Sequence, residues 1–263
     1  MSSVIVSASP GISNKIKSYC SLLRKYDSIK TTKHSDAYLF ENIEVATEDD
    51  FEKYPLIDNQ KFIDDDMWRF KIYEEDKKYL ENYEAIDLLY EDTPQYFINK
   101  YTDTISNLKI NSEILEYVNS FTENWNDMIG VHVRSWYCDK RKYHSNNIFE
   151  EQIDQLNPEK FFFCSDNSDV QKYFVERYGD KIVTYDRQLF NTWNFAESGH
   201  HDDIQITTDA FIELLILSKC STIIGTYCST FDEVAWWFGN CKSKVIIPKP
   251  INFDEVFHNT IFK

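Results

Sequence analysis

Glycine and proline are scarce in this sequence, with 6 of each among 263 residues. This scarcity argues against low-complexity segments and long flexible linkers. No stretch approaches the roughly 18 uninterrupted apolar residues of a membrane span, so we expect no transmembrane segment. The N-terminus also lacks the basic-then-apolar order of a signal peptide, and we therefore expect a cytoplasmic protein.

Ligand sets for metals are also missing. The 6 cysteines show no paired spacing of the zinc-binding kind, and Cys164 and Cys220 lie in apolar runs that predict reduced core thiols. The adjacent histidines of GHHDD (199–203) stand on a polar loop with no third ligand in view. The DDD run (64–66) matches a D-x-D metal–diphosphate motif in form, but it lies among other acidic loop residues. We therefore expect no metal and no other cofactor.

Positive charge is the third deficit, since the formal net charge is -16. A nucleic-acid-binding protein would carry a basic stripe, so we expect no nucleic-acid partner. The fingerprints of ATPases, dinucleotide-binding enzymes and serine hydrolases (G-x-x-x-x-G-K-[ST], G-x-G-x-x-G and G-x-S-x-G) are absent. Hydrophobic residues make up 42% of the chain and aromatic residues 16%, which is enough for one large or two small packed domains.

The second half of the sequence alternates continuous apolar strands with helices. This rhythm predicts a parallel sheet covered on both faces, a Rossmann-like domain that binds ligands at the carboxyl ends of its strands. The strands are expected at 128–133, 160–164, 181–185, 221–225 and 243–248. The helices are expected near 147–156, at 169–179, at 207–220 with a cap at Thr208, and at 230–239.

The first half begins in the same way, with a strand in VIVSA (4–8) and a helix over 15–26. Further strands are expected at 36–40 and 68–73, and further helices at 76–90, 94–106 and 111–121. With a boundary near residue 120, we expect two α/β halves, 1–120 and 121–263, that face a shared cleft.

Residues 129–137, IGVHVRSWY, send a histidine and an arginine to one face at the end of a core strand. His132 and Arg134 would then lie where such a sheet binds its ligands. The planar guanidinium of Arg134 suits a phosphate, because it donates two hydrogen bonds and stays charged. The alternative is a buried arginine paired with a structural carboxylate, beside a satisfied core histidine.

Residues 225–237, GTYCSTFDEVAWW, form a strand end, a short polar loop and a helix start. Thr230 and Glu233 fit a T-x-x-E capping box. Free N–H groups and the positive end of the helix dipole would meet an anion here, and the hydroxyls of Ser229 and Thr230 could donate to a pyrophosphate. The alternative is an ordinary capped helix.

Three acids complete the set of candidates. Glu213 lies in an apolar helix and must find a partner, with Asp209 one turn earlier on the same face. The Glu213 carboxylate would accept hydrogen bonds from guanine N1–H and N2–H2 together. The alternative is a salt bridge between Glu213 and a lysine or arginine. Asp166 ends another strand, where it faces the ligand or caps the next helix.

Three segments resemble the motifs of the GDP-fucose-dependent fucosyltransferases, the superfamily of α1,2, α1,6 and protein O-fucosyl enzymes. GVHVRSWY is similar to their HVRR or HIRRGD segment, FFFCSDN to their second motif, and IELLILSKCSTIIGTYCSTFDEVAWWFG to their third. The resemblance is good over 126–240, weaker over 1–30, where SPGISNKIKSYCSLLRKY is similar to their opening GLGNQL-type turn, and absent over 40–110. Ser135 stands where the family has its second arginine, which leaves the donor sugar and the linkage open.

The resemblance implies a metal-independent, inverting enzyme of the GT-B fold, two Rossmann-like halves with the donor bound mainly by 121–263 and the acceptor by 1–120. Arg134 would contact the β-phosphate and be the catalytic residue, Ser229 and Thr230 would hold the diphosphate, His132 and Glu213 the base or ribose, and Asp166 would fill the place of the second-motif acid.

The function that follows is transfer of a sugar, L-fucose, from GDP to an acceptor glycan hydroxyl. Trp136 and Trp193 would offer flat faces to acceptor sugar rings, unless they belong to the core. The alternatives are a GT-B transferase that uses another nucleotide sugar and a non-catalytic protein that binds nucleotide sugars or glycans.

Overall fold

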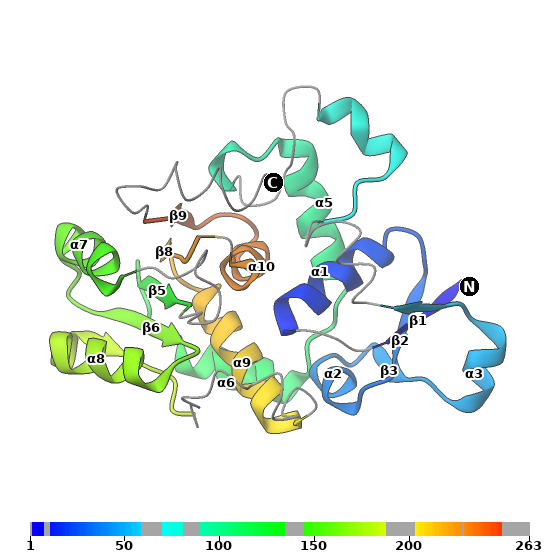
Figure 1. The fold of residues 1–263 in the computed structure, drawn as a ribbon, viewed down its shortest axis with the longest axis horizontal. Coiled ribbons are helices and arrows are strands. Elements are labelled where there is room, and N and C mark those ends of the chain that lie inside the picture. The colour runs from blue at the N-terminus through cyan, green and yellow to red at the C-terminus, as the bar shows by residue number, and fades with distance from the viewer. Residues whose placement is uncertain are drawn as a thin grey trace.

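The computed structural model describes residues 2–7, 11–58, 70–80, 90–134, 145–187, 203–227 and 229–248. They form an α/β fold with two separate sheets, and the strands within each sheet run parallel. Figure 1 shows the two sheets on opposite sides of the molecule, with α1 (Ile12–Leu22), α9 (Ile204–Leu217) and α10 (Thr230–Phe238) between them. The expected GT-B-like arrangement of two Rossmann-like sheets is confirmed.

The N-terminal sheet has the strand order β3-β2-β1-β4. β1, the strand expected from VIVSA, lies inside this sheet, and the side chains of Val4, Ile5 and Val6 are all buried. The strands are β1 (Ser3–Ser7), β2 (Ser28–Thr31), β3 (Ile43–Val45) and β4 (Leu56–Asp58). The other helical elements of this half are α2 (His34–Leu39), α3 (Glu48–Lys53), η1 (Glu74–Tyr79), η2 (Tyr90–Asp92), α5 (Gln95–Ser106) and α6 (Ser112–Phe121).

The C-terminal sheet has the strand order β7-β6-β5-β8-β9, and every strand expected from the sequence is present. The chain proceeds from β5 outward to β7 and then returns to build β8 on the other side of β5. The strands are β5 (Ile129–Val133), β6 (Phe161–Ser165), β7 (Ile182–Val183), β8 (Thr222–Ile224) and β9 (Lys244–Ile246). The remaining helical elements are α7 (Asn146–Leu156), α8 (Ser168–Tyr178) and η3 (Gly179–Lys181).

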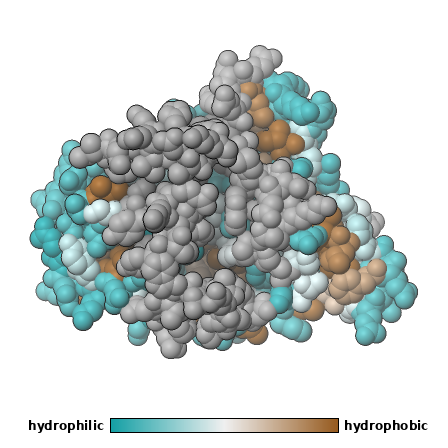
Figure 2. Space-filling view, viewed as in Figure 1, coloured by the Kyte–Doolittle hydropathy of each residue, from teal (hydrophilic) through white to brown (hydrophobic). Residues whose placement is uncertain are grey.

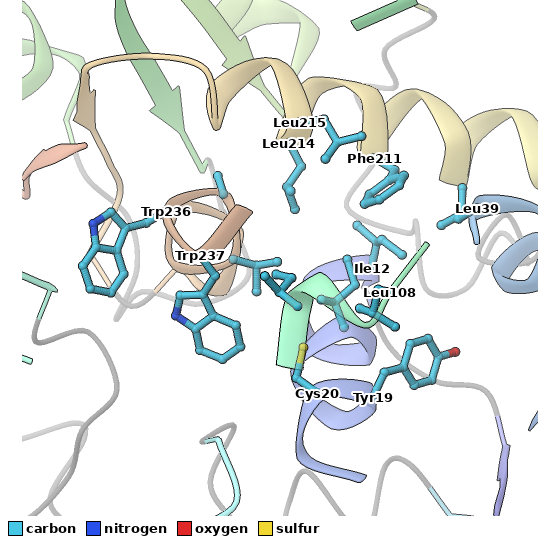
Figure 3. Packing of buried hydrophobic residues seen from close by; sticks show 14 of the residues in the cluster. Ile12, Tyr19, Cys20, Leu39, Leu108, Phe211, Leu214, Leu215, Trp236 and Trp237 are labelled. Atoms are coloured by element: carbon cyan, nitrogen blue, oxygen red, sulfur yellow. The ribbon is translucent and has the colours of Figure 1, made fainter. Parts of the chain in front are cut away.

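Helices from the two halves share one hydrophobic core. Figure 3 shows Phe211 and Leu214 of α9 and Trp237 of α10 facing Ile12 and Cys20 of α1. Burial of such large apolar side chains stabilises each by about 1.5–3 kcal/mol. The contact fixes α10, and with it the end of β8, against the N-terminal half of the chain.

Close contacts and free thiols also define the interior. A Cβ on Gly130 of β5 would lie 2.4 Å from Leu217 Cδ1, so the absence of a side chain lets α9 approach the sheet. Cys164 and Cys220 are buried free thiols, as expected.

Figure 2 shows hydrophilic residues over the two ends of the molecule, where α3 and α8 lie in Figure 1.

Some local expectations are wrong. Residues 36–40, expected as a strand, lie mainly in α2, because the side chain of Leu39 packs into the core shared with α9. Residues 70–73 are not in a strand, and of the helix expected at 76–90 the described part is the short η1. The cap of α9 is Asp203, whose carboxylate accepts from Ile206 N–H at 3.1 Å, and not Thr208.

Candidate functional site

The strand order of the C-terminal sheet defines where a ligand belongs. β5 and β8 are neighbours, but their connections leave in opposite directions along the sheet. In open parallel sheets ligands bind outside the carboxyl ends of the strands at such a reversal. Arg134 follows β5 directly, and Thr226 and Ser229 lie between β8 and α10. The expected site residues of these segments therefore meet at the reversal.

His132 is buried at the end of β5 and is held by a partner that the sequence did not reveal. Its Nδ1 atom lies 2.6 Å from Oδ1 of Asp232, and its ring stacks on Phe231 with 4.6 Å between centroids. The other carboxylate oxygen of Asp232 accepts from the N–H of Thr226 at 2.8 Å. Burial raises the pKa of Asp232, and the neighbouring His132 opposes that rise. These contacts fix the orientation of the imidazole ring.

Thr226 joins the ends of the two central strands. Its hydroxyl donates to the carbonyl oxygen of His132 at 2.9 Å and accepts from the N–H of Arg134 at 2.8 Å. A Cβ on Gly225 would lie 2.8 Å from the Asp232 carboxylate, so the glycine leaves room for that group. An acid in the first turn of α10 beside a glycine strand end was the available sequence signal for Asp232.

Arg134 and Asp166, both expected at strand ends of one sheet, form an ion pair at the ends of the adjacent strands β5 and β6. Nη1 of Arg134 lies 3.0 Å from Oδ2 of Asp166, and the two side chains are 37% and 26% exposed. Next to them, the Ser165 hydroxyl donates to the carbonyl oxygen of Val133 at 2.7 Å. The pair is open enough for an anion to approach the guanidinium.

The helix start at α10 differs in detail from the expectation. Ser229 is the N-cap and accepts from Phe231 N–H at 3.3 Å, and Thr230 is the first helical residue. The expected capping box is wrong, because Glu233 is buried against Lys17 of α1, with 2.7 Å between Oε2 and Nζ. The expected hydroxyls still stand at the positive end of the helix dipole.

Glu213 is buried, and its partner is Arg187, which the sequence reading missed. Nη2 of Arg187 lies 2.7 Å from Oε2 of Glu213 and also donates to the carbonyl oxygen of Ser165 at 3.0 Å. Burial raises the pKa of Glu213 to about 7, and Arg187 opposes the rise. The salt bridge left open at the sequence level is therefore present. Whether Glu213 also accepts from guanine stays a prediction.

Asp209 serves another contact. Its Oδ1 atom accepts from the Tyr185 hydroxyl at 2.9 Å and from the Gln205 side chain at 2.8 Å. Asp209 is close enough to Glu213 to raise the pKa of that acid, as its place on the same face of α9 predicted. A role of Asp209 toward the base stays a prediction.

Trp136, Trp193 and Ser135 lie outside the described residues, as do the acidic run at 64–66 and residues 199–202 of GHHDD. In the part of the chain that the structure describes, no three His, Cys, Asp or Glu side chains gather as metal ligands would. Among the same residues, every helix is too short or too polar to cross a membrane.

The fold and the strand-end cluster define the class: an α/β protein built like the GT-B glycosyltransferases. Among solved structures, fucosyltransferase NodZ from Bradyrhizobium aligns with a TM-score of 0.54 at 17% identity, over 89% of this chain and 91% of that one. A mutant of Arabidopsis thaliana FUT1 in complex with GDP aligns with a TM-score of 0.55 at 14% identity, over 95% of this chain and 71% of that one. NodZ alpha-1,6-fucosyltransferase co-crystallised with GDP aligns with a TM-score of 0.50 at 16% identity, over 89% of this chain and 91% of that one.

No protein-family model matches the sequence, and no curated protein matches it either. The likeness to the fucosyltransferase structures is a likeness of fold. It confirms, at that level, the resemblance that the three sequence motifs indicated.

The raised pKa of Glu213 predicts how stability depends on pH. Between pH 4.5 and about 7 the unfolded chain has released this proton and the folded chain has not, so raising the pH favours unfolding. Relative to a Glu213→Gln variant, the parent should lose on the order of 3 kcal/mol of unfolding free energy between about pH 5 and 8, at about 1.4 kcal/mol per pKa unit. Urea unfolding of both proteins across this range measures the loss. A difference between them that stays constant with pH would contradict it.

Proposed function

We propose that this chain is a glycosyltransferase that moves L-fucose from GDP to a hydroxyl of an acceptor glycan. The observation that supports the proposal most directly is the cluster of Arg134, Ser229 and Thr230 at the reversal point of the C-terminal sheet. An arginine and a helix N-terminus at such a point suit a diphosphate. Two structures of the same fold were determined with GDP, and that likeness supports the choice of nucleotide.

The donor would be held along the carboxyl edge of this sheet. Arg134 would bind the β-phosphate, positioned by Asp166, while Ser229 and Thr230 donate hydroxyl hydrogens to the diphosphate. Glu213 would accept from guanine N–H groups, and His132, oriented by Asp232, would hold the base or ribose. We assign donor binding to residues 121–263 and acceptor binding to 1–120, with Trp136 and Trp193 as candidate faces for acceptor sugar rings.

The reaction would be a single displacement with inversion at the anomeric carbon. Arg134 and the N-terminus of α10 would stabilise the negative charge that grows on the departing diphosphate. The anomeric carbon then gains oxocarbenium character, and a positioned acceptor hydroxyl attacks from the opposite face as the bond to the β-phosphate oxygen breaks. The proton of the hydroxyl would pass to the departing diphosphate. Because these groups can neutralise the diphosphate, we propose that no metal is needed.

Nucleotide binding is the first test. GDP and GDP-fucose should raise the melting temperature in a thermal-shift assay, whereas UDP and CDP should raise it less. A preference for UDP or CDP would favour a transferase with another nucleotide sugar.

Product analysis is the second test, with GDP-β-L-fucose, a glycan acceptor panel and excess EDTA. An α-linked fucoside formed in EDTA supports the proposal, and a β-linked product rules out inversion. Tight GDP-fucose binding without transfer or donor hydrolysis would favour the non-catalytic alternative, and activity only with Mg²⁺ or Mn²⁺ would overturn metal independence.

A further inference from the structure

Arg187 connects three elements at the carboxyl edge of the C-terminal sheet. It follows β7, donates to the carbonyl oxygen of Ser165 at the end of β6 at 3.0 Å, and pairs with Glu213 of α9 at 2.7 Å. Ser165 precedes Asp166, the partner of Arg134. A continuous line of contacts therefore runs along the strand ends from the arginine proposed for the phosphate to the acid proposed for the base.

The ion pair of Arg187 and Glu213 is incomplete. Nε of Arg187 and Oε1 of Glu213 are both buried, and neither has a hydrogen-bond partner among the residues that the structure describes. Buried polar atoms are nearly always paired, and buried arginine–carboxylate pairs often close with two parallel bonds. Here one bond holds the carboxylate through Oε2, while no described residue donates to Oε1.

We propose that Arg187 is a positioning residue for base recognition: it holds the Glu213 carboxylate through one oxygen and leaves the other to accept an N–H of the base. The inference rests on the proposed use of GDP. Guanine presents two neighbouring N–H donors to such a carboxylate, whereas uracil presents one N–H between two carbonyl oxygens. Arg187 therefore contributes to the preference for GDP over UDP without contacting either nucleotide.

The charge of Glu213 is the second contribution of Arg187. A buried carboxylate without a cation takes up a proton, and a protonated acid is a poorer acceptor for guanine. The pKa of Glu213 is about 7 beside Arg187 and would rise further without it. Burial is the main cause of the raised pKa. Of the facing groups, Arg187 and His132 favour the charged form and Asp209 opposes it, and the Cys164 thiol and the Tyr185 hydroxyl also interact with the carboxylate. The preference for GDP should therefore depend on pH.

The test measures the dissociation constants of GDP and UDP by calorimetry from about pH 6 to 8.5, in the parent and in Arg187→Gln. The parent should prefer GDP, and this preference should fall as the pH drops through about 7. In Arg187→Gln the preference at pH 7 should drop about 10- to 100-fold, the range expected for a lost hydrogen bond to a charged group. The pH at which half of the preference for GDP is lost should also be higher in this variant, while its affinity for UDP stays that of the parent.

Arg187→Lys and Arg177→Gln serve as comparisons. Lysine keeps the charge beside Glu213, so the pH midpoint should stay near that of the parent. Arg177 is a half-exposed residue of α8 that pairs with Asp154 at 3.3 Å. Its replacement should change neither the preference for GDP over UDP nor the pH midpoint of that preference.

The outcomes separate the two proposals. A parent that binds no nucleotide would overturn the proposed function itself. A parent that prefers GDP at every pH alike would overturn the inference, and this measurement needs no folded variant. An Arg187→Gln variant that keeps the parent's preference for GDP over UDP, with the same pH midpoint, would also overturn the inference.

Discussion

Arg134→Ala should weaken GDP binding by about 2–5 kcal/mol, that is by a factor of roughly 30 to several thousand. The guanidinium lies at the reversal point of the C-terminal sheet, 3.0 Å from Asp166, and is 37% exposed. Without it, the diphosphate would lose two charge-assisted hydrogen bonds, and the Asp166 carboxylate would no longer face the charge of Arg134. Calorimetric titration with GDP measures the loss, and the transfer rate should fall with it.

Two further variants make this result specific. Arg134→Lys keeps the charge but not the planar fork, so its affinity should lie between those of the parent and the alanine variant. Arg177→Ala removes another arginine with a carboxylate partner, on the outer helix α8, and should leave GDP affinity unchanged. If Arg134→Ala bound GDP as tightly as the parent, the diphosphate would lie elsewhere.

Lys17→Met should destabilise the protein by about 3–5 kcal/mol. Lys17 of α1 and Glu233 of α10 form an ion pair with side chains 3% and 2% exposed, and the variant removes the charge of Lys17 from beside the buried Glu233 carboxylate. Because domains are stable by only about 5–15 kcal/mol, this would be a large part of the total. Urea unfolding of the two proteins measures the difference.

The double variant Lys17→Met/Glu233→Leu tests the cause. Replacing a buried ion pair by apolar residues of similar size is often neutral, so the double variant should recover most of the stability lost in the single one. Lys172→Met is the surface comparison: its partner Glu176 is 3.8 Å away, the two side chains are 74% and 67% exposed, and the effect should stay below about 1 kcal/mol. A Lys17→Met variant as stable as Lys172→Met would contradict the assignment.

The pattern of apolar residues was enough to predict the C-terminal sheet. Its strands are continuous apolar runs such as KFFFC, and such runs are buried on both faces in any parallel sheet. In the first half the same reasoning failed at residues 36–40. DAYLF is short, and alternation over five residues fits a strand as well as a helix. Its contacts with α9, more than 160 residues later in the chain, made it part of α2.

The sequence by itself determined which side chains stand at the strand ends. A strand ends where its apolar run ends, so Arg134 and Asp166 had to emerge at the same edge of a parallel sheet, and they do meet there. The helix start at Ser229 and Thr230 follows from local chemistry in the same way. These features depend on near neighbours in the chain, and periodicity records them.

Only the tertiary structure decided which acid pairs with which cation. Asp232 contacts His132, 100 residues away in the chain, and Glu233 contacts Lys17, 216 residues away. Glu213 pairs with Arg187. A buried charge requires a partner, but many partners satisfy that requirement equally in the sequence. The choice is made by the distances that the packed sheets and helices impose, and no local pattern encodes those distances.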